Sequence, residues 1–212
     1  MIIKMKKYLD LRNEIDNEKI REAAEIIKGG GLVVFPTETV YGIGANGLNA
    51  NAVEKIFIAK QRKKDNPLIL LISSKEMLNK IVEDINEVET KLIESFWPGP
   101  LTIILKKNEA LPGYVTNNKD SIAIRIPDDE TVLKILNELD NPILLTSANK
   151  SGEDPALNSN QCYEVFNGEI PFIIKGECLI KEASTIIDLT DGEIKLIREG
   201  KISLEDIRKE II

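Results

Sequence analysis

Apolar residues along the chain follow two spacings, one typical of helices and one typical of buried strands. Spacings of three and four residues predict amphipathic helices, and short continuous apolar runs predict strands buried on both faces. Helical spacing occurs at 18–28, 51–62, 74–82, 86–96, 131–139 and 203–212. Strand-like runs occur at 32–35, 67–72, 101–106, 121–126, 142–146, 172–174, 185–189 and 193–198. Because helices and strands are mixed throughout, the pattern predicts one α/β or α+β domain around a twisted mixed sheet.

Polar, glycine-containing loops follow two of the predicted strands. Residues 36–47 form one such loop, and residues 147–155 form the other. Ligands of α/β proteins commonly bind where strands end at their carboxyl termini. We therefore expect both loops to contribute to a binding site.

Size and charge limit the classes of function that fit the sequence. The 212 residues fit one fairly large domain, and 42% hydrophobic with 30% charged residues is typical of a folded protein. The formal net charge is −7, from 35 acidic and 28 basic residues. This balance excludes a cationic field over the whole surface, such as drives non-specific nucleic-acid binding. Any phosphate-binding site must therefore be local.

The sequence argues against a zinc site and against a membrane or secreted protein. It contains no histidine, and its two cysteines, Cys162 and Cys178, are far apart. The amino-terminal residues lack the apolar segment of a secretory signal, and no apolar run approaches the roughly 20 residues of a membrane span. We expect a cytoplasmic protein without metal ligands and with reduced thiols.

Four cations lie within five residues at 60–64, where a predicted helix ends. The helix dipole favours cations there, so a solvated helix end is one interpretation. The other is a polyphosphate site, because lysine supplies a point charge and arginine a planar fork of donors. The sequence has neither GxxxxGK[ST] nor GxGxxG, so a nucleotide site here would rely on side-chain cations.

Arg125 interrupts the apolar run at 121–126. A buried guanidinium without a partner is costly, so this side chain must meet an anion. The sequence leaves open whether that anion is a carboxylate of the protein or of a ligand.

Several short motifs occur in a fixed order along the chain. They are PTETVYG at 36–42, KxR at 60–62 with NP at 66–67, WPGPLT at 97–102, IAIRIP at 122–127, TSANKSG at 146–152, STIIDL at 184–189 and IREG at 197–200. In this order and spacing they resemble the YrdC-like threonylcarbamoyl-AMP synthase family, over about residues 32–200. The resemblance implies an α/β fold with an open, twisted, mixed sheet and flanking helices around a concave cationic cavity. It also implies one domain over 1–212, without the extra carboxyl-terminal domain of longer members.

The family resemblance implies an L-threonylcarbamoyladenylate synthase, which is a nucleotidyltransferase. Such enzymes join L-threonine, bicarbonate or CO2, and ATP with Mg²⁺, and release pyrophosphate. A partner transferase then moves the threonylcarbamoyl group to tRNA, so tRNA is an indirect partner. Carried over by motif, the catalytic residues are Lys60 and Arg62. The expected threonine contacts are Thr37, Arg125, Asn149 and Ser184. The expected ATP contacts are Lys60, Arg62, Asn66, Ser121, Ser147 and Arg198.

One departure from the family pattern leaves the strictness for threonine open. Related archaeal-type enzymes have a histidine near the threonine where this chain has Leu71. A relative of the same fold that makes another adenylate is therefore one alternative. A second is a non-catalytic module that binds tRNA or double-stranded RNA. The acidic net charge and the 5% content of aromatic residues argue against it. A carbamoyl-transfer domain of the hydrogenase-maturation type is a third, but such proteins are longer and carry zinc-finger cysteines.

Overall fold

A computed structural model describes residues 7–10, 16–166, 169–170 and 172–211 of the chain, residues 7–10 by their backbone alone. Its helices are α1 Asn17–Lys28, α2 Ala50–Lys60, α3 Lys75–Leu78, α4 Glu87–Phe96, α5 Gly113–Thr116, α6 Glu130–Leu139, α7 Ser159–Val165 and α8 Leu204–Lys209. Its strands are β1 Lys7–Asp10, β2 Val33–Phe35, β3 Gly42–Asn46, β4 Ile69–Leu71, β5 Leu101–Lys106, β6 Ser121–Arg125, β7 Ile143–Ser147, β8 Phe172–Lys175, β9 Thr185–Asp188 and β10 Lys195–Arg198. None of the helices in this described part is long and apolar enough to cross a membrane.

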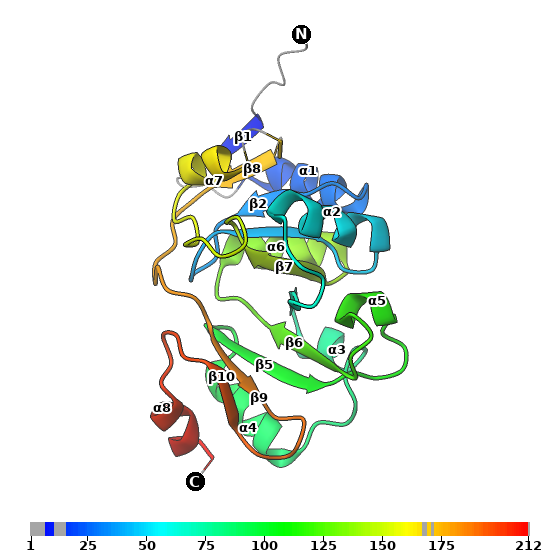
Figure 1. Ribbon diagram of the computed structural model, residues 1–212, viewed down its shortest axis with the longest axis vertical. Helices are drawn as coiled ribbons and strands as arrows, with labels where there is room; N and C mark the ends of the chain where they lie inside the picture. The colour runs from blue at the N-terminus through cyan, green and yellow to red at the C-terminus, as the bar shows by residue number, and fades with distance from the viewer. Residues whose placement is uncertain (1–6, 11–15, 167–168, 171, 212) are drawn as a thin grey trace.

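All ten strands belong to one mixed sheet, in the order β1-β8-β2-β3-β7-β4-β6-β5-β9-β10 (Figure 1). Parallel pairs join β1 to β8, β8 to β2, β4 to β6 and β5 to β9, and the remaining pairs are antiparallel. The sheet does not close, because β1 and β10 stand at its two edges. The predicted open mixed sheet with flanking helices is therefore confirmed.

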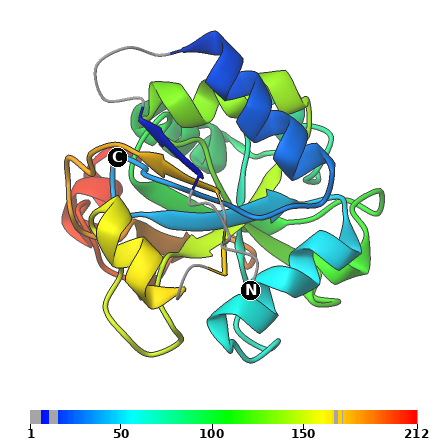
Figure 2. The ribbon, with the colours of Figure 1, turned by 90° about the horizontal axis from the view of Figure 1, so that it is seen from above.

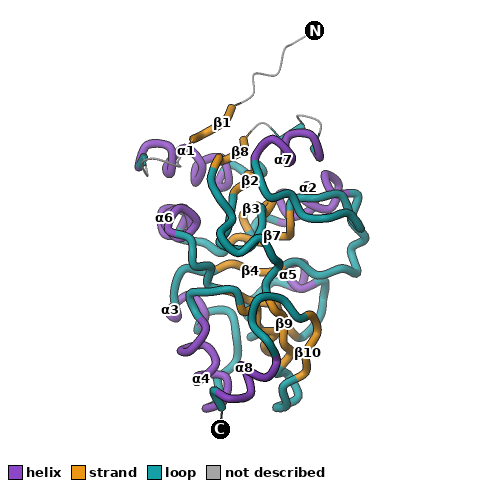
Figure 3. Tube along the Cα trace, turned by 90° about the vertical axis from the view of Figure 1, so that its left-hand side faces the viewer, coloured by secondary structure: helices purple, strands orange, loops and turns teal. Residues whose placement is uncertain are grey.

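Helices cover the two faces of the sheet unequally. Helices α1 and α6 pack side by side on one face, and α2 and α7 lie on the other (Figure 2). The side view shows the same separation, with α1 and α6 on one side of the strands and α2 and α7 on the other (Figure 3). Apolar residues of α1 and α6 form a core with strands β2, β7, β4 and β8, and those of α2 and α4 form a larger core on the opposite face. The face that α1 and α6 share also holds a cavity, whose lining includes Ile69 and Leu145 of that core.

Helix ends follow the expected capping chemistry. Asp16 and Asn49 accept hydrogen bonds from the first backbone N–H groups of α1 and α2, and Asn86 and Glu89 form a capping box on α4. Helix α2 ends at Gln61, whose φ of 53° turns the chain into the left-handed conformation. This turn directs the next residue, Arg62, back towards the sheet.

Five elements differ from the sequence-based expectation. The predicted loop 36–47 contains β3, and β1, α5 and α7 were not predicted. The helix predicted at 74–82 is only the single turn α3. Strand β3 has two glycines, which resemble a loop in sequence. A Cβ on Gly42 would lie 2.1 Å from a side-chain carbon of Leu145, and one on Gly44 would lie 2.7 Å from a side-chain carbon of Ile143, so a larger residue at either position would force its neighbour to move.

Candidate functional site

A cavity of about 220 Å³ lies on the sheet face that α1 and α6 partly cover. Its walls come from strands that are far apart in sequence, β3, β4, β5, β6, β7, β9 and β10, from the loops that follow β2, α2 and β7, and from the residues just before β9. Its polar lining consists of hydroxyl groups and guanidinium groups, from Thr37, Thr39, Tyr41, Thr146, Ser147, Ser184, Arg62, Arg125 and Arg198. Among the described residues that line it, three are arginines and none carries a carboxylate. Three guanidinium groups thus line one cavity in a protein of net charge −7.

Arg62 lies in the cavity wall immediately after α2. Its Nε donates to the Asn66 carbonyl at 3.1 Å and its Nη2 to the Pro67 carbonyl at 3.0 Å. Burial lowers its pKa from the ordinary arginine value. The expected ATP contact Asn66 is itself exposed and does not line the cavity. Its backbone carbonyl instead fixes the direction of Arg62.

Lys60 does not line the cavity, although the sequence predicted a phosphate contact there. The side chain is fully buried at the end of α2, where Nζ donates to the Ser147 carbonyl and to Asn149 Oδ1. Burial, together with the nearby charges of Arg62 and Lys150, lowers the pKa of Lys60 to about 7. A point cation at a helix end looks solvated in sequence, but this one joins α2 to the loop after β7.

The loop after β7 is fixed by a hydrogen-bond network around Asn149. Oδ1 of Asn149 accepts from Lys60 Nζ at 3.0 Å and from Ser147 Oγ at 2.5 Å, and Nδ2 donates to the carbonyls of Lys150 and Glu153 at 2.8 Å each. These bonds use the full capacity of the amide side chain. The expected threonine contact at Asn149 is therefore already occupied by protein groups. Ser147 does line the cavity, as expected.

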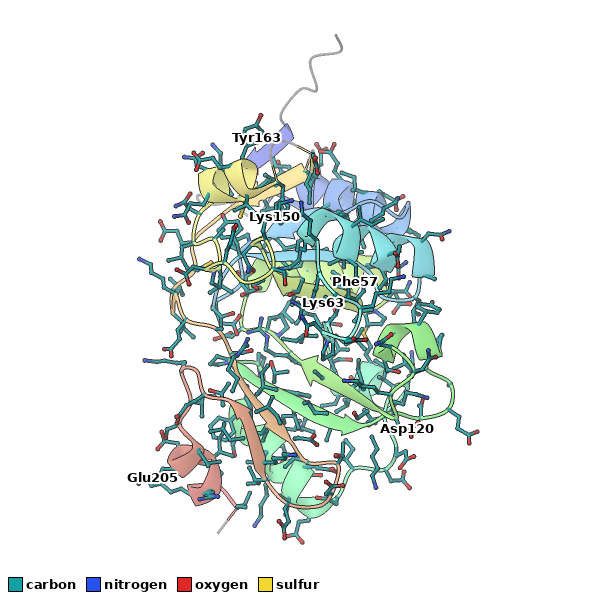
Figure 4. All side chains as sticks on the ribbon, viewed as in Figure 1. Phe57, Lys63, Asp120, Lys150, Tyr163 and Glu205 are labelled. Carbon is teal, nitrogen blue, oxygen red and sulfur yellow. The ribbon has the colours of Figure 1, made fainter. Side chains whose placement is uncertain are left out.

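Lys150 adds a second connection between this loop and α2. Its Nζ donates to the Ala59 carbonyl at 2.7 Å and lies 5.5 Å from the ring centre of Phe166, at the end of α7. Figure 4 shows Lys150 beside α2 and α7, in the upper part of the view. Together with Lys60, it links the loop after β7 to α2.

Arg125 meets a carboxylate of the protein. Its Nη1 lies 3.0 Å from Glu38 Oε1 and 3.2 Å from Thr39 Oγ1, and both charged side chains are buried. Thr39 Oγ1 lies 2.8 Å from Thr37 Oγ1, whose own hydroxyl donates to the Val40 carbonyl. Because Thr37 uses its hydrogen on Val40, Thr39 must be the donor in the pair. A directed chain thus runs from Arg125 through Thr39 to Thr37.

Arg198 and Ser184 form another part of the cavity wall. Arg198 donates from Nε and Nη2 to the Ser184 carbonyl at 3.1 and 2.8 Å, and from Nη2 to Ser184 Oγ at 3.2 Å. Thr102 Oγ1 lies 2.9 Å from the same hydroxyl. Burial and, after it, the positive charge of Arg125 lower the pKa of Arg198. Two guanidinium groups that repel each other across a cavity favour an anion between them.

Two residues singled out from the sequence lie away from the cavity. Ser121 shares a face of the sheet with the cavity-lining Ala123 and Arg125, but it stands at the start of β6 and does not line the cavity. Leu71 pairs with Arg125 in the sheet and is fully buried in the core beneath α6. Thr37, Arg62, Arg125, Ser147, Ser184 and Arg198 are brought together as expected.

Sequence reasoning missed Glu38, Thr39 and Thr102. The motif that contains Glu38 and Thr39 was recognised, and a carboxylate partner for Arg125 was one of the two possibilities. Glu38 and Arg125 are 87 positions apart, however, and no local pattern reports that pairing.

Both the sequence and the fold of this chain resemble those of known proteins. The family model described as "Telomere recombination" (Sua5/YciO/YrdC) matches residues 25–200. A threonylcarbamoyl-AMP synthase of Pyrococcus abyssi is 45% identical over 204 residues, which cover 96% of this chain and 60% of that protein. A putative threonylcarbamoyl-AMP synthase of Methanocaldococcus jannaschii is 35% identical, with 92% of this chain and 94% of that protein covered. The crystal structure of P. abyssi Sua5 complexed with L-threonine superposes with a TM-score of 0.93 at 45% identity, covering 97% of this chain and 61% of the other.

The chain thus spans about three fifths of the P. abyssi protein and nearly all of the M. jannaschii protein. The matched region contains every residue that lines the cavity. By sequence and by fold, the chain belongs to the Sua5/YciO/YrdC family.

Proposed function

We propose that this chain is an L-threonylcarbamoyladenylate synthase, a nucleotidyltransferase that uses L-threonine, bicarbonate or CO2, and ATP. The proposed products are threonylcarbamoyl-AMP and pyrophosphate. A separate transferase would deliver the threonylcarbamoyl group to tRNA. The relatives named threonylcarbamoyl-AMP synthase and the L-threonine complex of P. abyssi Sua5 support this reading.

The observation that carries the proposal is the charge of the cavity. Arg62, Arg125 and Arg198 meet around one space that no carboxylate of the described lining faces. Guanidinium groups are weakly hydrated and bind carboxylates and phosphates through paired donors. A substrate pair that brings one carboxylate and a triphosphate matches such a wall.

The three arginines are assigned to two substrates. Arg125, together with Thr37 and Ser184, is proposed to bind the carboxylate and orient L-threonine. Arg62 and Arg198, with Ser147, are proposed to bind the phosphates of ATP. Lys60 and Asn149 act in this scheme by holding the loop that carries Ser147.

The chemistry requires positioning more than proton transfer. The threonine amine attacks CO2 and loses a proton to give a carbamate. A carbamate oxygen then attacks the α-phosphorus of ATP, and the bond from that phosphorus to the bridging oxygen of pyrophosphate breaks. Fixed guanidinium groups offset the charge on the transferring and leaving phosphates, and bound substrates gain effective concentration.

Magnesium would enter with ATP as part of the substrate. In the described part of the chain, no group of three or more Cys, Asp or Glu side chains is placed to hold a metal ion. The cavity lining offers hydroxyl and carbonyl oxygens, but no carboxylate among its described residues. The proposal therefore gives the protein no metal ligand of its own.

Pyrophosphate release by the purified chain tests the proposal. The reaction contains ATP, Mg²⁺, bicarbonate and L-threonine, and parallel reactions omit bicarbonate or replace threonine with serine. We expect release that requires both threonine and bicarbonate, with threonylcarbamoyl-AMP formed in equal amount. Release indifferent to either compound would overturn the proposal. Salt-sensitive tRNA binding without turnover would instead favour the RNA-binding alternative.

A further inference from the structure

The ion pair between Glu38 and Arg125 has a geometry that stability does not explain. Both side chains are buried, with 4% and 3% of their surface exposed. Only one oxygen and one nitrogen meet, at 3.0 Å, while Glu38 Oε2 and Arg125 Nε are buried without a hydrogen-bond partner among the described residues. A paired arrangement would satisfy all four atoms. A buried pair that leaves two of them unsatisfied contributes little to stability, because desolvation offsets the attraction.

The arrangement does fix the direction of the guanidinium. Arg125 lines the cavity and Glu38 does not, so the carboxylate holds the guanidinium from outside the cavity. Nη1 is held by Glu38 and Thr39. No described residue accepts from Nη2, and this nitrogen is not among the polar atoms shut off from solvent. One free pair of donors therefore remains on the cavity side.

A second carboxylate lies near Arg125 without holding it. Asp129 Oδ1 accepts from the Val132 N–H at 2.9 Å and caps α6. Burial, partly offset by that backbone hydrogen bond, and the charge of Glu38 together raise the pKa of Asp129 to about 6. Asp129 makes no hydrogen bond to Arg125 in the described part of the chain. Glu38 and Asp129 thus separate two effects, contact with the guanidinium and nearby negative charge.

We propose that Glu38 is a positioning residue, whose carboxylate holds Nη1 of Arg125 so that Nη2 can donate to the carboxylate of an amino-acid substrate. The proposal rests on the proposed function, which supplies L-threonine as that substrate. The alternating direction of side chains at Thr37, Glu38 and Thr39 supports it, because the two threonines line the cavity and the glutamate between them does not.

Two conservative variants distinguish position from charge. Glu38→Gln keeps the length and one acceptor oxygen but removes the charge, whereas Glu38→Asp keeps the charge but is one methylene too short to reach Nη1. We expect Gln to bind L-threonine within about threefold of the wild type, since the acceptor survives. We expect Asp to raise the Kd and the KM for threonine by about 10-fold or more, because small displacements of a substrate-orienting group are costly. The KM for ATP should stay within about threefold in both variants.

The measurements are calorimetric titration with L-threonine and pyrophosphate-release kinetics on the whole chain. Asp129→Asn, which keeps the helix cap, is the matched control for loss of nearby charge and should leave the Kd for threonine unchanged. In an Arg125→Lys background, Glu38→Asp should cause no further loss, since Glu38 acts only through Arg125.

Four results would overturn the positioning role. They are a weaker Gln than Asp variant, wild-type affinity in both, parallel losses for ATP and threonine, and additive losses in the Arg125→Lys background. Wild-type protein that binds no L-threonine would overturn the proposed function itself, and with it the substrate named here. The wild-type arm thus keeps the two failures apart.

Discussion

The burial of Lys60 makes a prediction about stability and pH. The perturbation is Lys60→Met, which keeps an unbranched apolar stem and removes the amine. In the folded protein the pKa of Lys60 is lowered to about 7, first by burial and then by Arg62 and Lys150. In the unfolded chain it returns to about 10.4. The unfolded state therefore binds more protons between these values, and the wild type should gain stability as pH rises through that window.

The size of this gain follows from the two pKa values. Linkage gives an increase of about 2 kcal/mol in the free energy of unfolding between pH 7 and pH 9 from this group alone. Below pH 6 the penalty for burying the charged amine is nearly complete, so the curve should flatten there. The Met variant lacks the titrating group and should lack the increase, although it also loses the hydrogen bonds to Ser147 and Asn149.

Urea unfolding of both proteins at pH 6, 7, 8 and 9 provides the assay. Groups that titrate in both proteins cancel in the difference, so the stability of Met relative to wild type should fall by about 2 kcal/mol from pH 7 to pH 9. Lys63→Met, at an exposed lysine three positions away, is the control and should follow the wild type. Parallel curves for Lys60→Met and wild type would refute the reasoning, and would place the amine in solvent or in the cavity.

Three further predictions concern the cavity wall. Arg62→Ala should lower the rate of pyrophosphate release by about 100-fold or more with little change in Tm. Lys63→Ala, at the exposed neighbouring residue, should leave the rate unchanged. Equal rates in the two variants would show that Arg62 only ends the helix. Thr39→Val breaks the chain from Arg125 to Thr37 and should cost about 1–3 kcal/mol in urea unfolding, and a variant as stable as wild type would contradict the network. Gly42→Ala puts a methyl group 2.1 Å from Leu145 and should lower the free energy of unfolding by about 1–3 kcal/mol through overpacking. Gly152→Ala, in open space at φ +94°, should lower it by only about 1–2 kcal/mol through backbone strain. A larger loss of stability at Gly152 than at Gly42 would argue against the close packing of β3.

The sequence predicted those parts of the fold that local patterns encode. Short apolar runs located eight of the ten described strands, β2 and β4 to β10. Strand β3 was not predicted, because Gly42 and Gly44 carry no apolar pattern. These glycines instead pack closely against Leu145 and Ile143 of the neighbouring strand. Helix α7 escaped because its seven residues are mostly polar and only Cys162 is buried.

The sequence could predict a residue of the candidate site where the position of that residue on a strand or loop is enough to turn its side chain to the cavity. Arg125 and Arg198 are examples, because each stands at the end of a strand. The direction of Lys60 and the saturation of Asn149 were not, since both depend on an acceptor or donor contributed by another segment. The partner of Arg125 was open for the same reason. Charge and spacing define candidates, and only the packed chain decides which of them a ligand can reach.

The place of Arg198 in the sheet has a consequence for how the site opens. Arg198 stands on β10, one of the two edge strands, which pairs with β9 alone among the described strands, whereas Arg125 stands on β6 between two neighbours. Edge strands separate from a sheet at a lower free energy than central ones. Detachment of β10 alone would remove one guanidinium and leave the core folded. One part of the cavity wall therefore belongs to the interior of the sheet and another to its edge. Amide hydrogen exchange should be faster along β10 than along β6.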